Sequence, residues 1–319
     1  MTKIKLVTNS IISLIIVISS LYIFINNSNG EVDFNNLITN IYSNLILLFL
    51  ASFLLVVSVL LRAIRWKFLL NVDINIMNLF SAQLIGYFVN NILPIRIGDI
   101  IKSYVIAKKT NNSTGYVIGS VFVERVLDTI TLLFFSTFLF YYLGSTYFDT
   151  ININFYNISI FLIFTISFYF LFKFYLQKFI PKIIINFFKE MKKGIYQIKH
   201  TNIAIIIISS ILIWLIYLTN VYLIQKIFEE FELSFMQCLL LLFVSSFIQM
   251  IPSGFGALGI FQLGAESVLM RLEVLSYHNF LILLWLYSFI NYTLLGAFYF
   301  IKECNFTLKK IYSDITKFY

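Results

Sequence analysis

Long apolar stretches make up most of the chain, and the charged residues gather between these stretches. A bilayer core is about 30 Å thick, so a helix needs roughly 20 apolar residues to cross it. Six stretches have about that length and predict full membrane spans, at residues 8–26, 43–63, 116–143, 156–176, 202–225 and 279–301. The pattern predicts an all-α polytopic membrane protein with a single membrane domain over residues 1–319.

Two further apolar regions, 77–110 and 236–271, are interrupted near their middle by proline and glycine. Proline removes a backbone donor and clashes with the preceding helical turn, and glycine permits a sharp reversal. Each region therefore predicts two short helices joined by a break, which is a re-entrant hairpin that enters and leaves on one side. The alternative is an ordinary kink in a longer helix. The residues expected at the breaks are Pro94, Gly98, Pro252, Gly254, Gly256 and Gly259.

The charges between the apolar segments predict their sides, because cytoplasmic loops carry an excess of Lys and Arg. Of the 23 Lys and Arg residues, Lys226 and Arg271 fall outside, Arg96 and Arg125 fall within membrane segments, and the other 19 fall inside. Connections 27–42 and 226–235, in contrast, are acidic. The pattern predicts a protein integral to the cytoplasmic (inner) membrane with both termini in the cytoplasm. No small-x-small cleavage site follows the first apolar run, which predicts an uncleaved span.

The order of the segments divides the chain into two similar halves, residues 1–150 and 151–319. Each half contains two spans, a broken hairpin and a further span. The first half begins inside and the second begins outside, so the halves are predicted to be inverted repeats. Inverted repeats with paired broken helices are typical of transporters, whose binding site lies at the breaks.

Composition supports a membrane protein, since 60% of the residues are hydrophobic and only 12% are charged. A soluble domain of this size could not bury that much apolar surface. The net charge of +8 comes from residues between apolar segments, so it does not indicate nucleic-acid binding. The chain has two cysteines and two histidines, at unrelated positions. This argues against a disulfide framework, a metal site or histidine catalysis. We expect no metal, no cofactor and no catalytic residue.

Ionisable side chains inside a membrane are costly and usually functional. Guanidinium groups suit phosphate because they offer forked donors. Alternative interpretations assign Arg62 and Arg65 to lipid phosphates at the end of a span, and make Glu124, Arg125 and Asp128 a structural ion network. The polar amides near the breaks have the alternative of bonding free backbone groups. The candidate substrate-binding residues are Arg62, Arg65, Asn91, Arg96, Asp99, Lys102, Glu124, Arg125, Asp128, Gln249, Gln262 and Glu266.

Three motifs resemble the lysylphosphatidylglycerol synthase transmembrane-domain family, also called flippase-like membrane proteins. They are Leu61–Trp66, the segment Asn91–Asp99 together with Glu124–Asp128, and Pro252–Gln262. The chain departs from the family pattern at three points. Asp99 stands where members often have Glu, Phe255-Gly256 stands where they often have Pro-Gly, and many have Glu near Gln262.

The resemblance implies lipid translocation or a role in a lipid-linked glycan pathway. Some relatives carry a soluble aminoacyl-transferase domain, and the sequence ends at Tyr319 without one. The resemblance therefore implies a protein that is not itself a synthase.

The resulting hypothesis is a lipid flippase or transporter that moves an anionic phospholipid or a polyprenyl-phosphate-linked lipid. Its partner would be membrane lipid, and the sequence leaves the oligomeric state open. One alternative is an intramembrane enzyme acting on a lipid head group, with Glu124 and Asp128 as acid and base. Another is a non-catalytic membrane partner of a glycosyltransferase or lipid synthase.

Overall fold

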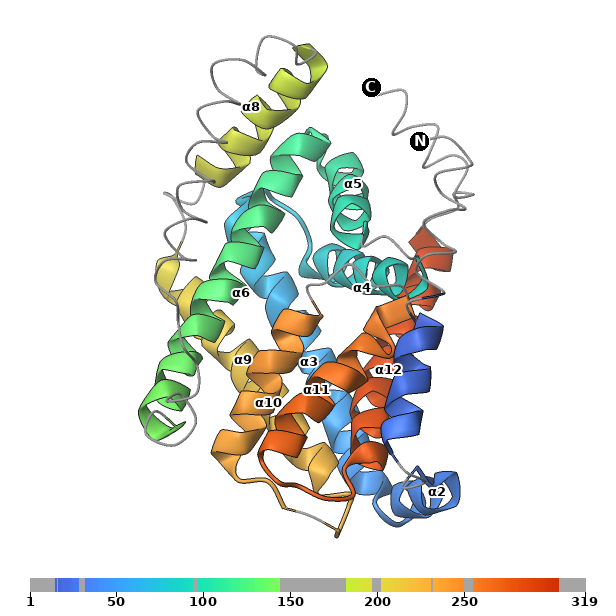
Figure 1. The fold of residues 1–319 in the computed structure, drawn as a ribbon. Coiled ribbons are helices and arrows are strands. Elements are labelled where there is room, and N and C mark those ends of the chain that lie inside the picture. Colours follow the sequence, from blue (N-terminus) through green and yellow to red (C-terminus); the bar gives the residue numbers. More distant parts are fainter. Residues whose placement is uncertain are drawn as a thin grey trace.

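A computed structural model describes residues 15, 17–28, 32–93, 97–143, 182–196, 202–230, 232–249 and 255–303. These residues form helices and no strand, so the predicted all-α class is confirmed for the described part of the chain (Figure 1). The first helix, Val17–Asn27, lies beside α12. The remaining elements are α2 Phe34–Ser43, α3 Leu45–Leu70, α4 Ile76–Ile92, α5 Gly98–Thr110, α6 Thr114–Leu143, α8 Lys182–Tyr196, α9 Ile203–Gln225, α10 Phe235–Ile248, η3 Phe255–Ala257, α11 Ile260–Arg271 and α12 His278–Glu303.

Helices α3, α9 and α12 are long and apolar enough to cross a bilayer, with mean hydropathies of 2.7, 2.3 and 1.7. They coincide with three predicted spans, and the protein is a helical membrane protein. Helix α6 has 30 residues but carries three charged groups in its first half. The predicted span at 156–176 lies outside the described residues, and the span at 8–26 is described only in part.

Two connections that were expected to be loops contain amphipathic helices, which corrects the prediction. In the first, Asp33 begins α2, because its Oδ1 accepts hydrogen bonds from the backbone N–H groups of Asn35 and Asn36 at 2.8 and 3.3 Å. The apolar side chains of α2 share one face, four residues apart, and that face is exposed. An exposed apolar stripe on a short polar helix is typical of a helix lying at the membrane surface. The stripe consists of Phe34, Ile38 and Tyr42.

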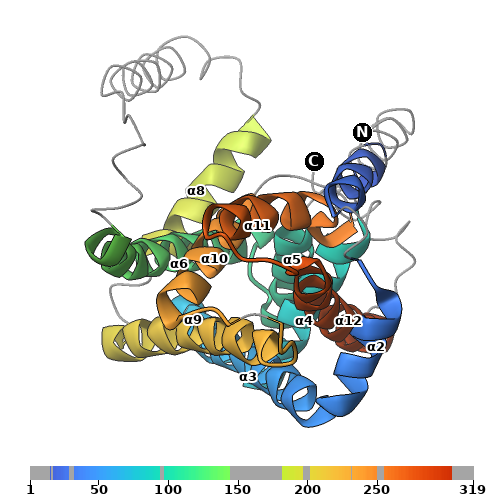
Figure 2. The ribbon, with the colours of Figure 1, turned by 60° about the horizontal axis from the view of Figure 1, so that its bottom comes forward.

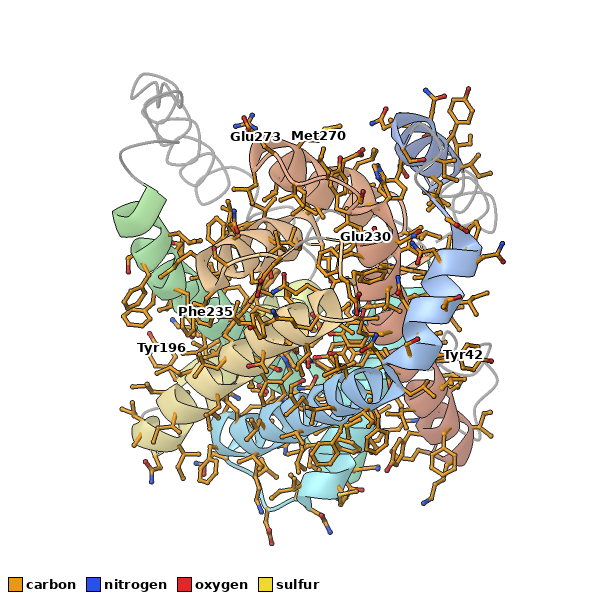
Figure 3. All side chains as sticks on the ribbon, turned by 90° about the horizontal axis from the view of Figure 1, so that it is seen from below. Tyr42, Tyr196, Glu230, Phe235, Met270 and Glu273 are labelled. Carbon is orange, nitrogen blue, oxygen red and sulfur yellow. The ribbon has the colours of Figure 1, made fainter. Side chains whose placement is uncertain are left out.

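The second correction concerns α8, which lies within the connection predicted at 173–201. It packs against α6 through glycines, because a Cβ on Gly119 would lie 3.2 Å from the Cα of Gly194 and would overlap the carbonyl of Met191. Tyr42 on α2 and Tyr196 on α8 lie at opposite edges of the molecule in the view from below (Figure 3). Both helices are too short and too polar for the sequence pattern to predict membrane spans there. The tertiary structure was needed to identify them as helices.

Helices α4 and α5 form an antiparallel pair around the first break. The Oδ1 atom of Asn90 accepts a hydrogen bond from the N–H of Gly98 at 2.8 Å and so caps α5. A Cβ on Gly98 would lie 2.6 Å from that oxygen and would overlap the carbonyl of Gly86. At the other end of the pair, Lys109 Nζ donates to Asn78 Oδ1 at 3.0 Å. Pro94 and Arg96 lie outside the described residues.

The second interrupted region divides into α10 and α11, which also pack against each other. Between them, Gly256 and Gly259 have φ values of +64° and +81°, a left-handed conformation that glycine adopts readily. The N–H of Gly259 donates to Oε1 of Gln262 at 2.6 Å, which closes the first turn of α11. Pro252 and Gly254 lie outside the described residues.

Contacts between connections define two ends of the molecule. At the first, which we call the basic end, Lys109 pairs with Glu303 at 2.6 Å, so the ends of α5 and α12 meet there. At the other, the acidic end, Asn36 donates to Glu230 at 2.7 Å, and Asn279 donates to the carbonyl of Asp33 at 3.2 Å. Figure 3 looks onto the acidic end, where Glu230 and Glu273 are labelled.

Helix α4 packs closely against α12, and α3 lies beside α9 (Figure 2). The contact between α4 and α12 depends on Gly296, because a Cβ there would lie 2.5 Å from Cβ of Phe88 and would overlap the carbonyl of Leu84. These pairings bring segments from both halves of the chain around one interior region.

We expect Gly98→Ala to destabilise the protein by about 1–3 kcal/mol, because the added methyl group must push α5 away from α4. Thermal unfolding in detergent, followed by size-exclusion chromatography, measures this effect. Gly86→Ala is the matched control on the same interface. Its Cβ would meet nothing closer than 3.2 Å, and the gain of about 1 kcal/mol in helix propensity offsets that crowding. Equal losses in the two variants would contradict the close approach at Gly98.

Candidate functional site

A buried ion network joins α3 to α6. Arg62 Nη1 lies 2.7 Å from Asp128 Oδ2, and Arg65 Nη2 lies 2.8 Å from Asp128 Oδ1. Each arginine also approaches Glu124 Oε1 at 3.4 Å. The four side chains are at most 8% exposed. The spacing explains this arrangement, since Glu124 and Asp128 lie one helical turn apart on α6 and face the two arginines of α3 together.

Glu124 also connects the network to the first helix pair. Lys102 Nζ on α5 lies 3.1 Å from Glu124 Oε2 and donates to Gln83 Oε1 on α4 at 3.0 Å. Gln83 Nε2 donates back to both oxygens of Glu124, at 3.0 and 3.2 Å. One carboxylate therefore contacts groups from α3, α4 and α5.

Neutral side chains complete the environment of the cations. Arg62 Nε donates to the hydroxyl of Tyr217 at 3.0 Å, and Arg65 Nη1 donates to Ser210 Oγ at 3.0 Å, which ties α9 to the network. Lys102 Nζ lies 5.0 Å from the ring centroid of Trp66, which is a cation–π distance. Trp66 sits one turn after Arg62 on α3. These contacts satisfy charged groups where little water is available.

A second ion pair lies at the edge of the buried network and is open to solvent. Arg125 donates two hydrogen bonds to Asp99, from Nη2 to Oδ1 at 2.7 Å and from Nε to Oδ2 at 3.0 Å. Their side chains are 44% and 37% exposed. The pair joins the first turn of α5 to α6. Exposed pairs of this kind contribute little to stability, so the geometry leaves Arg125 available for other anions.

The charges of this site do not balance. Within the described residues the site contains four cations, Arg62, Arg65, Lys102 and Arg125, and three carboxylates, Asp99, Glu124 and Asp128. The exposed pair of Arg125 and Asp99 is neutral as a whole, so the one excess positive charge belongs to the buried network, which is removed from water. An uncompensated charge in an apolar environment is costly and favours the approach of an anion.

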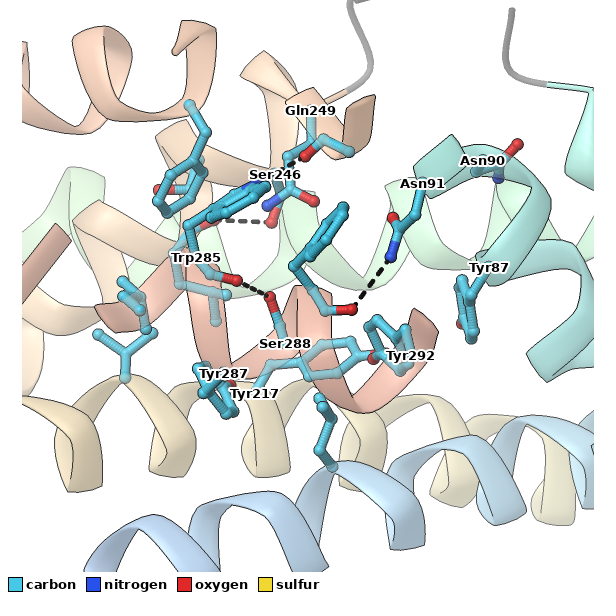
Figure 4. A pocket seen from close by; sticks show the side chains of 18 of the residues that line it. Tyr87, Asn90, Asn91, Tyr217, Ser246, Gln249, Trp285, Tyr287, Ser288 and Tyr292 are labelled. Atoms are coloured by element: carbon cyan, nitrogen blue, oxygen red, sulfur yellow. Dashed lines mark hydrogen bonds between the residues drawn. The ribbon is translucent and has the colours of Figure 1, made fainter. Parts of the chain in front are cut away.

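A cavity of about 300 Å³ lies beside this excess charge. Arg62, Arg125 and Asp128 line it on one side. The broken helices reach it from both halves of the chain, with Asn91 at the end of α4 and Gln249 after α10 (Figure 4). Residues next to both interruptions therefore line one space.

Aromatic rings form much of the remaining wall. Tyr87 stacks on Tyr292 with ring centroids 4.4 Å apart, and Trp285 stacks on Phe289 at 4.5 Å. The indole N–H of Trp285 donates to the carbonyl of Gly256 at 2.9 Å, which links α12 to the second break. The wall thus combines apolar ring faces with hydroxyl and amide groups.

The amide of Asn91 bonds within the protein. Its Nδ2 donates to Thr293 Oγ1 at 3.0 Å and to the carbonyl of Phe289 at 3.4 Å, and the second contact is drawn in Figure 4. Asn91 therefore fixes the end of α4 against α12 while lining the cavity. The alternative in which amides near a break bond to free backbone groups describes Asn90, which accepts from the N–H of Gly98, whereas the amide of Asn91 bonds to α12.

The structure separates the predicted site residues into groups. Arg65 and Glu124 lie behind the cavity wall and contact Asp128 and Arg62, which line it. Asp99 contacts Arg125 of the wall, whereas Lys102 contacts Asp99 and Glu124. Gln262 and Glu266 lie elsewhere, since Gln262 closes the first turn of α11 and Glu266 faces His278. Their proposed contact with substrate stays a prediction, as it does for the whole set. Those that line the cavity are Arg62, Asn91, Arg125, Asp128 and Gln249.

Sequence reasoning missed several members of the site. Gln83 was missed although it precedes Asn90 by two helical turns, a spacing that places both on one face of α4. Nothing in the sequence distinguishes Tyr217 from the other tyrosines of the chain, and only the packing of α9 against α3 brings it to Arg62.

Comparison with known proteins identifies relatives. The family model described as the lysylphosphatidylglycerol synthase transmembrane region matches residues 10–298. A UPF0104 membrane protein of Methanocaldococcus jannaschii is 30% identical over 235 residues, which cover 68% of this chain and 95% of that protein. These matches support a membrane protein connected with lipid metabolism or transport.

Two shorter matches agree with this result. Another UPF0104 membrane protein of Methanocaldococcus jannaschii is 39% identical over 93 residues, or 28% of this chain and 27% of the relative. One from Pyrococcus horikoshii is 30% identical over 99 residues, or 29% of this chain and 30% of the relative. The chain thus matches less than a third of the length of these two relatives. No solved structure matches the chain.

We expect Glu124→Gln to destabilise the protein by roughly 3–5 kcal/mol, because it leaves three buried cations on α3 and α5 without their shared carboxylate. Asp99→Asn, the comparison variant, removes an exposed carboxylate and should cost at most about 1 kcal/mol. Thermal unfolding in detergent measures both variants. A Glu124→Gln protein as stable as the Asp99→Asn protein would show that the network does not hold these helices together.

Proposed function

The chain belongs to the lysylphosphatidylglycerol synthase transmembrane-region family, and we propose that it moves an anionic lipid across the cytoplasmic membrane. The lipid is an anionic phospholipid or a polyprenyl-phosphate-linked lipid. The observation that carries the proposal is the single excess positive charge beside the cavity. A phosphate group supplies the missing negative charge, and guanidinium groups bind it with forked donors.

The size of the cavity supports a head group as its occupant. A volume of about 300 Å³ is at the lower limit of ordinary ligand pockets. It accommodates a polar head group but not the acyl or prenyl chains. The chains therefore remain in the surrounding bilayer while the head group passes through the protein.

Arg125 is the first contact for the phosphate, because it is the most exposed cation of the site. Asp99 occupies its two donors in the absence of lipid. An arriving phosphate competes with Asp99 for this fork, while Lys102, 3.3 Å from Asp99 Oδ1, retains the displaced carboxylate. Arg62 then offers a second cation in the cavity wall. The exchange of one anion for another lets the lipid bind and leave without exposing an unpaired charge.

The arrangement of the broken helices supports two inverted repeats that alternate around this site. The α4–α5 pair opens toward the basic end, where Lys109 meets Asn78. The α10–α11 pair begins and ends near the acidic end, and both breaks reach the cavity. Re-entrant hairpins entering from opposite faces allow the head group to be reached from either side in turn.

The pairing of Glu124 and Asp128 with cations supports transport of the lipid without chemical conversion. A general acid or base must be able to bind and release a proton during the reaction. Glu124 and Asp128 each contact two or more cations. Such pairing favours the ionised form throughout and suits a structural and electrostatic role.

We expect Arg125→Gln to lower translocation of a fluorescent phosphatidylglycerol analogue in proteoliposomes by roughly tenfold or more, since a forked contact to phosphate is lost. Dithionite quenching of the outer leaflet measures the rate. Lys189→Gln, which removes an exposed cation on α8, is the charge-matched control and should leave the rate unchanged. Full activity in Arg125→Gln would overturn this site.

Mass spectrometry of the vesicle lipids, taken before and after incubation, separates transport from the alternatives. Unchanged lipids together with translocation support the proposal. Covalently altered lipids would favour an intramembrane enzyme. Inert protein that purifies tightly with a glycosyltransferase or lipid synthase would favour a non-catalytic partner.

The proposed orientation places the basic end and both termini in the cytoplasm. In a background without cysteine (Cys238→Ala and Cys304→Ala), we expect Glu229→Cys at the acidic end to react with an impermeant maleimide on intact cells. Lys189→Cys at the basic end should react only after permeabilisation. Both side chains are exposed, so each position serves as the accessibility control for the other. The reverse pattern of labelling would contradict the orientation.

A further inference from the structure

A second buried acid–base pair lies apart from the cavity. Glu266 on α11 and His278, the first residue of α12, are 2% and 4% exposed. Glu266 Oε1 lies 3.5 Å from His278 Nε2. Neither residue lines the cavity. The pair therefore has no role in the head-group binding proposed above.

Three elements enclose the pair near the acidic end. Asn27, at the end of the first helix, donates to Glu266 Oε2 at 3.5 Å. The ring of Phe24 lies 5.2 Å from the imidazole, and the ring of Tyr277 stacks on it at 4.5 Å. Among the described residues, Tyr277 thus places a titratable ring directly against His278.

The remaining charges nearby lie further from the pair. Arg271, the last residue of α11, and Glu273, on the connection to α12, are exposed. The backbone carbonyl of Asp33 accepts a hydrogen bond from the side chain of Asn279. Among the described residues, the ion pair that Glu266 makes is with His278. The imidazole is thus the group that can compensate the carboxylate.

Burial makes the protonation of this pair a single event. A carboxylate removed from water is costly unless it is paired with a cation or neutralised. The pair satisfies that requirement with one shared proton, either as imidazolium with carboxylate or as imidazole with carboxylic acid. Loss of the proton leaves a buried carboxylate beside a neutral ring and so disfavours the closed packing of α11, α12 and the first helix.

A related arrangement occurs in the first half of the chain, with the acid and the base exchanged between the two helices and with a different base. There, Lys102 on α5 pairs with Glu124 on α6, the next helix along the chain. Here, Glu266 on α11 pairs with His278 on α12, which is again the next helix. Lysine stays charged across the physiological range, whereas imidazole changes charge between about pH 5 and 8. One half thus has a permanent ion pair and the other has a pair that gains and loses a proton.

We propose that Glu266 and His278 form a proton-binding site that couples a transmembrane proton gradient to movement of the lipid. The coupling rests on the transport proposed above, whereas the binding of the proton does not. A proton entering from the acidic end is held between Glu266 Oε1 and His278 Nε2 and keeps α11 packed on α12. Its release frees this half of the molecule to move, and no other bond forms or breaks.

The first experiment detects the proton directly. The chain has two histidines, so in the His200→Gln variant the NMR signals of labelled histidine report on His278 alone. We expect these signals to change with pH, because the site binds and releases a proton. Adding Glu266→Gln should weaken its affinity for the proton by roughly tenfold or more, because the carboxylate no longer stabilises the imidazolium.

Glu273→Gln in the same background is the matched control, since it removes an exposed carboxylate on the adjoining connection. It should leave the titration nearly unchanged. Signals of His278 that do not change with pH would overturn the proton site. So would equal titrations with and without Glu266.

The second experiment tests the coupling. Proteoliposomes containing the fluorescent phosphatidylglycerol analogue are given a pH gradient, and we expect it to accelerate translocation several-fold. Glu266→Gln and His278→Gln should abolish the acceleration, and Glu273→Gln should retain it. If the pH gradient leaves the translocation rate of the unaltered protein unchanged, the coupling is overturned. A protein whose His278 titrates as expected but that moves no lipid under any condition would instead overturn the proposed function.

Discussion

Charges placed inside a membrane must be paired, and this requirement organises the described part of the structure. Arg62 and Arg65 on α3 face Glu124 and Asp128 on α6, and Lys102 brings α5 to the same carboxylate. Because each of these groups would be costly alone in an apolar environment, the helices that carry them can pack only in an arrangement that brings them together. The cavity lies next to this network, so the same interactions that position the helices also create the electrostatic character of the site.

Close backbone contacts supply the second constraint. Gly98 lets α5 lie against α4, and Gly296 lets α12 lie against the same helix. Without a strong hydrophobic driving force between helices in lipid, such small-residue contacts are a main source of packing energy. They place the end of α4 at the cavity, where Asn91 bonds to α12. The end of α4 is thus held in place by neighbours on both sides, at the edge of the cavity.

The two halves of the chain use a buried acid–base pair at the same position, between the second helix of a broken pair and the helix that follows it. The pair in the first half belongs to a larger network and includes lysine. The pair in the second half lies outside that network and includes histidine. The two halves therefore differ in the base that pairs with the buried carboxylate, and in the proposed mechanism this difference gives transport its direction. The family relation is compatible with this picture, since it indicates a role in lipid metabolism or transport.

By itself, the sequence determined that the protein is helical and lies in a membrane, because the length and composition of α3, α9 and α12 leave no other environment for them. It also located the two interrupted regions and most of the charged residues of the site, since proline, glycine and embedded charge are conspicuous in an apolar chain. It did not identify α2 and α8 as helices, nor Gln83 and Tyr217 as members of the site. The sequence could not show that Glu124 contacts three cations of its own chain. Those cations lie 22 to 62 positions away along the chain. Only the tertiary structure could decide this, because pairing energy depends on distances across helices that local patterns do not encode.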